Sequence, residues 1–155
     1  MERDELLRNV APCGLVCYTC TACGHGVVKE HAQKLSFYLT GVSDFLASQH
    51  MRGDKKKLDA CMATLEYYSR QSGPGCREEE TQCSFKNCVI RACTREKHID
   101  FCADCADFPC GKIDLPDVFT DKWKASNTRI REAGVEQYFD EEKEVPHFLR
   151  YQVDK

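Results

Sequence analysis

Closely spaced cysteines are the residues of this chain best suited to chemistry. Four of them occur within eleven residues, separated by three, two and two positions: Cys13, Cys17, Cys20 and Cys23. A two-residue gap lets two thiolates from one tight turn bind the same metal ion. This spacing, here called a knuckle, therefore recurs in zinc and iron–sulfur sites. The cluster predicts a metal site near the start of the chain.

A second cysteine region follows after a long interval. Its members are Cys76, Cys83, Cys88, Cys93, Cys102, Cys105 and Cys110. Cys102 and Cys105 form its clearest knuckle. Cys88 and Cys93 are five residues apart, so an ideal helix would turn them about 140° from each other. Either Cys88 precedes the helix and shares a site with Cys93, or the two serve different sites.

The number of thiols limits the number of sites. The twelfth cysteine, Cys61, falls on the apolar stripe of an expected helix and is interpreted as a small core residue. Of the remaining eleven, two four-coordinate sites would use eight. Three sites need twelve ligands, so a histidine such as His25 or His98 would have to join. Cys76 could complete the first cluster, but spacing alone leaves the pairing open.

Two familiar iron–sulfur patterns fit poorly. Cys13, Cys17 and Cys20 have the spacing of the radical S-adenosylmethionine motif, but Thr19 stands where that motif has an aromatic residue, and the chain is short for its partial barrel. A bacterial ferredoxin run would place a cysteine followed by proline after Cys23, but position 27 is Val27. These two modules are therefore disfavoured, and a zinc site and another kind of iron–sulfur site both remain open.

Composition narrows the function classes. The chain has 155 residues and a formal net charge of −3, which disfavours nucleic-acid and anionic-membrane binding. No apolar run approaches the ~20 residues of a membrane span. Residues 1–8 lack the basic start and apolar stretch of a secretory signal. A cytoplasmic protein with reduced, metal-binding thiols is therefore expected, rather than one with six disulfides.

The elements that position these cysteines are predicted to be helices. Apolar spacing and capping signals favour helices over residues 2–10, 28–50 with an interruption at Gly41, from Asp54 to about 70, 89–97, 120–133 and 135–143. Strand signals are weak, and no linker or repeat is evident. We expect a mainly α fold, in which residues 1–155 form one small domain of helices with cysteine-rich metal-binding loops.

Three classes of function remain open from the residues alone. The leading hypothesis is a metal-binding protein with structural sites and no identifiable reaction. An enzyme with an open metal position or activated thiolate is the second, although no His-Glu-x-x-His motif or nucleotide loop is present. The third is a redox or sulfur-transfer protein that uses thiols beyond the coordination count. A protein partner is compatible with each of them.

The ordered cysteine motifs resemble a cysteine-rich prokaryotic family catalogued as a domain of unknown function, number 3795. The resemblance rests on residues 13–17 with Cys20, 75–76, 88–93, 102–110 and 130–136. Two features depart from that family: Cys76 lacks a neighbouring cysteine, and Cys23 is an additional thiol. The resemblance implies metal binding, with zinc as the expected ion, and no established reaction.

Overall fold

The computed structural model describes residues 1–48, 54–78, 83 and 87–151. Within these ranges the regular elements are helices, and the β-type pairings are two isolated bridges, Val10 with Val16 and Cys23 with Gly73. The predicted mainly α fold class is confirmed. None of the helices in these ranges is both long and apolar enough to cross a bilayer.

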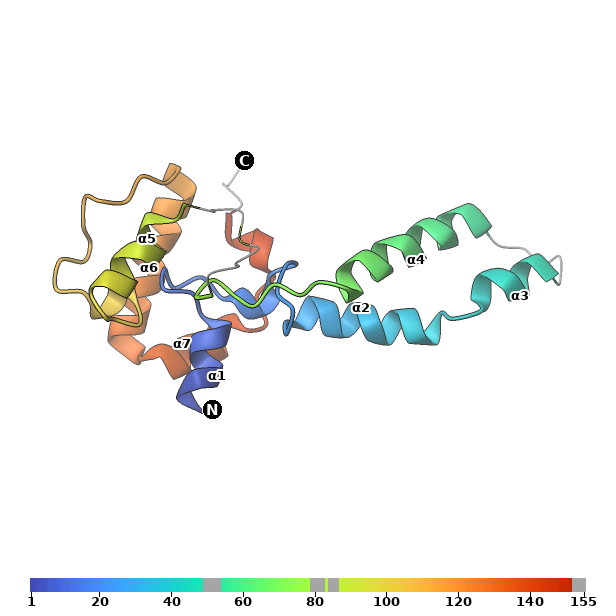
Figure 1. Cartoon of the computed structure of the whole chain (residues 1–155), viewed down its shortest axis with the longest axis horizontal. Helices are drawn as coiled ribbons and strands as arrows, with labels where there is room; N and C mark the ends of the chain where they lie inside the picture. Colours follow the sequence, from blue (N-terminus) through green and yellow to red (C-terminus); the bar gives the residue numbers. More distant parts are fainter. Residues whose placement is uncertain (49–53, 79–82, 84–86, 152–155) are drawn as a thin grey trace.

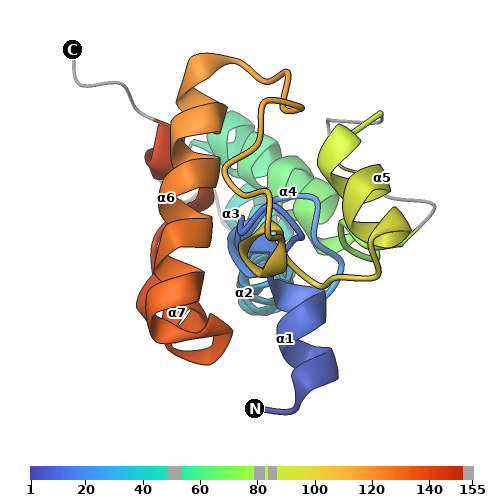
Figure 2. The same ribbon diagram turned by 90° about the vertical axis from the view of Figure 1, so that its left-hand side faces the viewer.

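Four α-helices surround the cysteine-rich loops to form the body of the molecule (Figure 1). These are α1 (Arg3–Asn9), α5 (Val89–Glu96), α6 (Asp117–Ala133) and α7 (Val135–Glu142). Seen from the end of the body, α5 and α6 lie on opposite sides of the loops (Figure 2). Three short 3-10 helices complete it: η1 (Cys17–Thr19), η2 (Cys102–Asp104) and η3 (His147–Tyr151).

Helix α6 supplies the buried face against which the loops pack. Its buried residues, Trp123, Ser126, Asn127 and Ile130, follow the i, i+3, i+4, i+7 spacing of one helical face. The helix begins at Asp117, three residues earlier than the spacing predicted, because the Pro116 carbonyl already accepts bonds from the first turn. Ile130 belongs to a cluster with buried side chains from α1, α7, η2 and the loops: Leu6, Val10, Val16, Phe101, Ala103, Tyr138 and Phe139. Trp123 belongs to a second cluster with Ile90 of α5 and Cys102.

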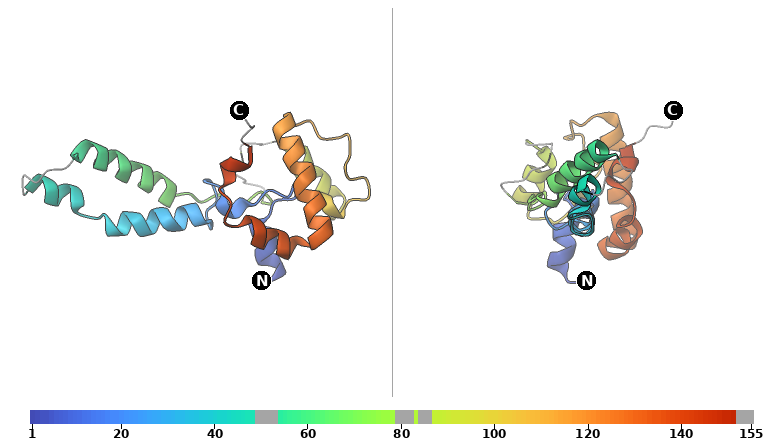
Figure 3. Two further views of the ribbon diagram at one scale, coloured as in Figure 1. Left: turned by 180° about the vertical axis from the view of Figure 1, so that it is seen from behind. Right: turned by 90° about the vertical axis from the view of Figure 1, so that its right-hand side faces the viewer.

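The other three helices form an arm that extends away from the body (Figure 3). They are α2 (Val27–Tyr38), α3 (Val42–Ser48) and α4 (Lys55–Ser69), with α2 and α4 packed side by side. The predicted interruption at Gly41 is confirmed, and Gly41 adopts φ +80° there. Asp54 caps α4 as predicted, accepting a bond from the Lys57 N–H at 3.1 Å.

Cys61 lies on the arm and is exposed, so its interpretation as a core residue is wrong. Leu58, Met62 and Leu65 of the apolar stripe are half-buried where α4 packs on the other arm helices, whereas Cys61 lies at the edge of the stripe. The side of α4 that carries Cys61 therefore faces solvent. This position also separates Cys61 from the other eleven cysteines, which lie in the body.

The Asn127 side chain on α6 joins two distant loops. Its amide oxygen accepts a bond from the Ala103 N–H at 2.8 Å, and its amide nitrogen donates to the carbonyls of Cys13 and Trp123 at 2.8 and 2.9 Å. Asn127 is fully buried, so water cannot replace these bonds. One side chain thus fixes the loop of the first cysteine cluster against the loop of the Cys102–Cys105 knuckle.

We expect Asn127→Ala to lower the free energy of unfolding by about 2–4 kcal/mol, because it leaves buried backbone groups in both loops unpaired. Thr128→Ala removes an exposed side chain from the same helix and is expected to change it by less than about 0.5 kcal/mol. Urea denaturation of both variants provides the measurement. Equal effects of the two substitutions would contradict the role assigned to Asn127.

Candidate metal centre

The structure divides the eleven candidate cysteines between two cavities. The larger cavity, of about 280 Å³, is lined by Cys13, Cys17, Cys20, Cys23, Cys76, Cys83 and Cys88. The smaller, of about 30 Å³, is lined by Cys93, Cys102, Cys105 and Cys110. A single water-sized species needs roughly 10–15 Å³ of such space. The smaller cavity therefore has room for one ion, and the larger one has room for more than one atom.

This division answers the question raised by Cys88 and Cys93. Cys88 is the N-cap of α5 and has an extended backbone, with φ −68° and ψ 113°. It therefore precedes the helix and faces the larger cavity, whereas Cys93 lies within α5 and lines the smaller one. The two thiols therefore line different cavities, and the metal that each would bind stays a prediction.

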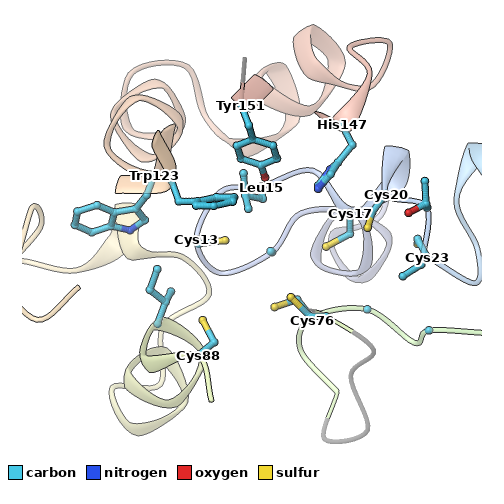
Figure 4. A pocket seen from close by; sticks show the side chains of 18 of the residues that line it. Cys13, Leu15, Cys17, Cys20, Cys23, Cys76, Cys88, Trp123, His147 and Tyr151 are labelled. Atoms are coloured by element: carbon cyan, nitrogen blue, oxygen red, sulfur yellow. The ribbon is translucent and has the colours of Figure 1, made fainter. Parts of the chain in front are cut away.

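A close backbone contact brings Cys76 to the first cluster. The Gly24 N–H donates to the Gly73 carbonyl at 2.9 Å, and a Cβ added at Gly24 would lie 2.8 Å from the carbonyl carbon of Ser72. Only glycine allows this approach. The backbone N–H of Cys76 then donates to the Cys17 sulfur, so two thiols 59 positions apart in the sequence meet in one cavity (Figure 4).

Arg77 anchors the backbone next to Cys76. Its guanidinium donates to the carbonyls of Leu7 at 2.8 Å and Val10 at 3.2 Å, and it lies over the Phe101 ring with 4.8 Å to the ring centroid. These contacts tie the residue after Cys76 to α1 and to the hydrophobic core. The position of Cys76 therefore depends on the body as a whole.

Arg131 of α6 plays the corresponding role for the smaller cavity. It donates to the carbonyls of Ala103 at 2.6 Å and Phe108 at 3.3 Å, and also to that of Cys105. Its guanidinium lies 4.8 Å from the centroid of the Phe108 ring. Arg131 thus holds the loop that carries Cys102, Cys105 and Cys110 in its curved path.

Backbone N–H groups point at several of the sulfur atoms. In four cases the donor is the residue two positions after the cysteine: Leu15 for Cys13, Ala22 for Cys20, His25 for Cys23 and Asp107 for Cys105. Each of these bonds favours the thiolate over the thiol. The same donor position recurs in both cavities, so these four sulfur atoms are oriented by their own local backbone.

Burial and mutual repulsion oppose ionisation of these thiols. Burial raises the pKa of Cys17 to about 12 and that of Cys102 to about 11, and it raises that of Cys13 further. Neighbouring thiols add to the rise: Cys110, Cys93 and Cys105 act on Cys102, and Cys23, Cys20 and Cys83 act on Cys17. Converging thiols of this kind become stable thiolates when a cation binds among them.

The smaller cavity also contains groups that favour thiolates. The Lys97 Nζ lies 3.1 Å from the Cys105 sulfur and 2.6 Å from an Asp107 carboxylate oxygen. The Lys97 hydrogen bond, followed by the Asp107 N–H, lowers the pKa of Cys105. The Trp123 indole N–H is buried without a regular hydrogen-bond partner among the described residues, and its proximity partly offsets the raised pKa of Cys102.

The two histidines considered as possible ligands, His25 and His98, line neither cavity. His25 Nε2 donates to the Arg8 carbonyl oxygen at 3.3 Å, and His98 is exposed. His147, which the sequence reasoning missed, does line the larger cavity, and burial lowers its pKa. No cysteine lies near it in the sequence, so spacing carried no signal for it.

The side chains do not yet enclose an ion. Among the described residues, no three histidine, cysteine, aspartate or glutamate side chains stand in the arrangement of a bound metal ion. What the structure brings together is therefore the set of thiols that share each cavity. The assignment of individual metal ligands stays a prediction.

Comparison with known proteins gives one match. The model of a family described as "Protein of unknown function (DUF3795)" matches residues 9–115. No curated protein and no solved structure matches the chain. The matched span includes both cysteine regions and the arm, and it ends before α6, α7 and η3.

We expect Lys97→Met to shift the alkylation of Cys105 to higher pH in the metal-free protein. Lys97 lowers the pKa of this thiol, so the thiolate is present at lower pH with the lysine than without it. The rate of iodoacetamide labelling at Cys105, followed by mass spectrometry against pH, measures the shift. Lys124→Met, an exposed lysine on α6, is the control, and an identical profile in Lys97→Met would contradict the contact.

Proposed function

Because the chain belongs to the DUF3795 family, whose description names no reaction, we propose its function from its own geometry: it is a metal-binding protein that holds zinc at cysteine-ligated structural sites. The observation that carries this proposal is the convergence of thiols from distant segments on two separate cavities. Zinc binds four thiolates, or three thiolates and one imidazole, in a tetrahedral structural site.

The smaller cavity fits a single zinc ion. Its four cysteines equal the number of ligands in a tetrathiolate site, and its volume suits one ion. The Lys97 ammonium donates to the Cys105 sulfur, and the buried Trp123 indole N–H lies close enough to Cys102 to favour its thiolate. Metal-bound ligands regularly have support of this kind. Cys93, Cys102, Cys105 and Cys110 would hold the ion, which would cross-link α5 to the loop before α6.

The larger cavity fits a metal as well, but with thiols in excess. Seven cysteines line it, three more than one tetrahedral ion uses. Its volume and thiol number favour a second candidate for this cavity alone, an iron–sulfur cluster held by cysteine thiolates. In either case the bound metal would tie the first cluster to Cys76 and so join the two cysteine regions.

Such metal sites would contribute much of the free energy of folding. A structural zinc ion contributes on the order of 10–16 kcal/mol in zinc-finger peptides, whereas a whole domain is stable by only about 5–15 kcal/mol. Two ions would therefore dominate the folding of the body. The arm helices, which pack on one another away from both cavities, depend on them less.

Protein purified without oxygen is expected to be colourless and to contain about two zinc ions per chain. Because burial keeps the thiols protonated in the metal-free state, each zinc should release about one proton for every buried thiol that it binds, and affinity should rise with pH. Elemental analysis and calorimetry in buffers of different ionisation enthalpy provide the measurements. A brown protein containing iron and acid-labile sulfide would contradict zinc and support an iron–sulfur cluster. A metal-free protein with disulfides would contradict both kinds of site.

Substitutions in the two cavities should remove different ions. Cys20→Ser is expected to lower the zinc content by about one ion, Cys105→Ser by about one other, and the double variant by both. Cys61→Ser changes an exposed thiol on the arm and is the matched control, with the content of the unmodified protein. Loss of both ions in either single variant, with helical content preserved by circular dichroism, would contradict two independent sites.

A further inference from the structure

The C-terminal 3-10 helix, η3, is fixed over the larger cavity by side-chain contacts. The Arg150 side chain is almost fully buried and donates to the Thr19 hydroxyl at 3.0 Å and to a Glu142 carboxylate oxygen at 2.7 Å. The Tyr151 ring packs on Phe119 of α6, with 4.7 Å between ring centroids. These contacts place η3 between the first cysteine loop and α6.

His147, the first residue of η3, is held in a defined orientation. Its Nδ1 lies 3.2 Å from the Val16 carbonyl oxygen, next to Cys17 in the sequence. A carbonyl oxygen can only accept, so Nδ1 carries the hydrogen and Nε2 of the neutral ring has a free lone pair. The rings of Phe148 and Tyr151 contact the imidazole edge-on, at 5.1 and 5.6 Å between centroids.

The imidazole points into the cavity that holds the first cysteine cluster. Figure 4 shows the His147 ring on the same side of the cavity as Cys17 and Cys20, with Cys76 opposite them. Histidines that bind metal through one ring nitrogen almost always donate the other N–H to a carbonyl or carboxylate. The bond from His147 to Val16 is of this kind.

The negative charge of a zinc–thiolate site favours a neutral ligand in the larger cavity. A zinc ion with four thiolates carries two negative charges, and the smaller cavity offsets part of them with Lys97. Among the described residues that line the larger cavity there is no lysine or arginine, and most of the lining is apolar. Arg77 acts on Cys17 and Cys76 from outside the lining, with its guanidinium bonded to the Leu7 and Val10 carbonyls. Replacing one thiolate by an imidazole lowers the charge that must be buried there by one unit.

We propose that His147 Nε2 is a ligand of the zinc ion in the larger cavity, together with three of the cysteine thiolates that line it. This rests on the proposed function and adds to it a nitrogen ligand and a ligand set of three cysteines and one histidine. The ligand comes from a segment outside the span matched by the family model. Binding of the ion would then lock η3 onto the first cysteine loop.

The decisive variant is His147→Asn. An asparagine amide can still donate to the Val16 carbonyl but offers no counterpart of Nε2, so it separates a ligand from a merely structural residue. We expect zinc affinity at one of the two sites to fall by about 100-fold or more, since loss of even a supporting contact typically costs 10–100-fold. Competition with a coloured zinc chelator measures it, and circular dichroism of the metal-free variant checks its folding.

Two further variants test whether His147 is a ligand of the metal ion. His147→Cys should keep the metal content and increase the thiolate-to-metal charge-transfer absorption of the cobalt-substituted protein, because one more sulfur binds the ion. His25→Asn removes a histidine that lines neither cavity and should change neither affinity nor spectrum. An unchanged cobalt spectrum in His147→Cys would contradict the assignment.

Nitrogen NMR of the unmodified protein tests the same point without any substitution. Zinc addition should shift the His147 Nε2 resonance strongly while the Nδ1 hydrogen is retained. Zinc binding without that shift, or an affinity of His147→Asn equal to that of the unmodified protein, would overturn the histidine ligand and leave the proposed function standing. Failure of the unmodified protein to bind zinc would instead overturn the proposed function itself.

Discussion

The arrangement of the body depends on the Asn127 amide, which bonds both cysteine loops at once. Its partners, the Cys13 carbonyl and the Ala103 N–H, are separated by 90 positions in the sequence and lie beside the two knuckles. The amide supplies a donor and an acceptor in a site that excludes water, so neither loop can move without leaving a buried polar group unpaired. Helix α6 therefore fixes the distance between the two cavities.

The two cavities differ in how they accommodate negative charge. In the smaller one, the Lys97 ammonium touches the Cys105 sulfur, and four cysteines match the needs of one ion. The larger one is bounded by apolar and aromatic side chains and holds more thiols than one ion can use. The smaller cavity is therefore suited to a structural metal ion. In the larger cavity, the excess thiols and the His147 imidazole are the groups from which chemistry beyond structure could arise.

Local features were predictable to the extent that they depend on neighbouring residues. The helices, the interruption at Gly41 and the Asp54 cap follow from apolar period, glycine conformation and side-chain hydrogen bonding, and the structure confirms them. The start of α6 differs by three residues, and the predicted helix end at residues 49–50 lies outside the described residues. Cys61 was assigned wrongly because an apolar stripe shows which face of a helix is buried only where a partner covers it. His147 was missed because it reaches the cavity through η3, far from any cysteine in the sequence.

The amino-acid sequence by itself determined the knuckles, since a two-residue gap brings successive sulfur atoms together by local backbone geometry. The N–H donors two positions after Cys20 and Cys105 are equally local. It also determined the mainly helical elements between them. Only the tertiary structure decided which thiols share a cavity. Cys76 joins the first cluster through the contact of Gly24 with the 72–73 backbone, and Cys88 separates from Cys93 at the start of α5. These are contacts between distant segments, and spacing along the chain carries no information about them.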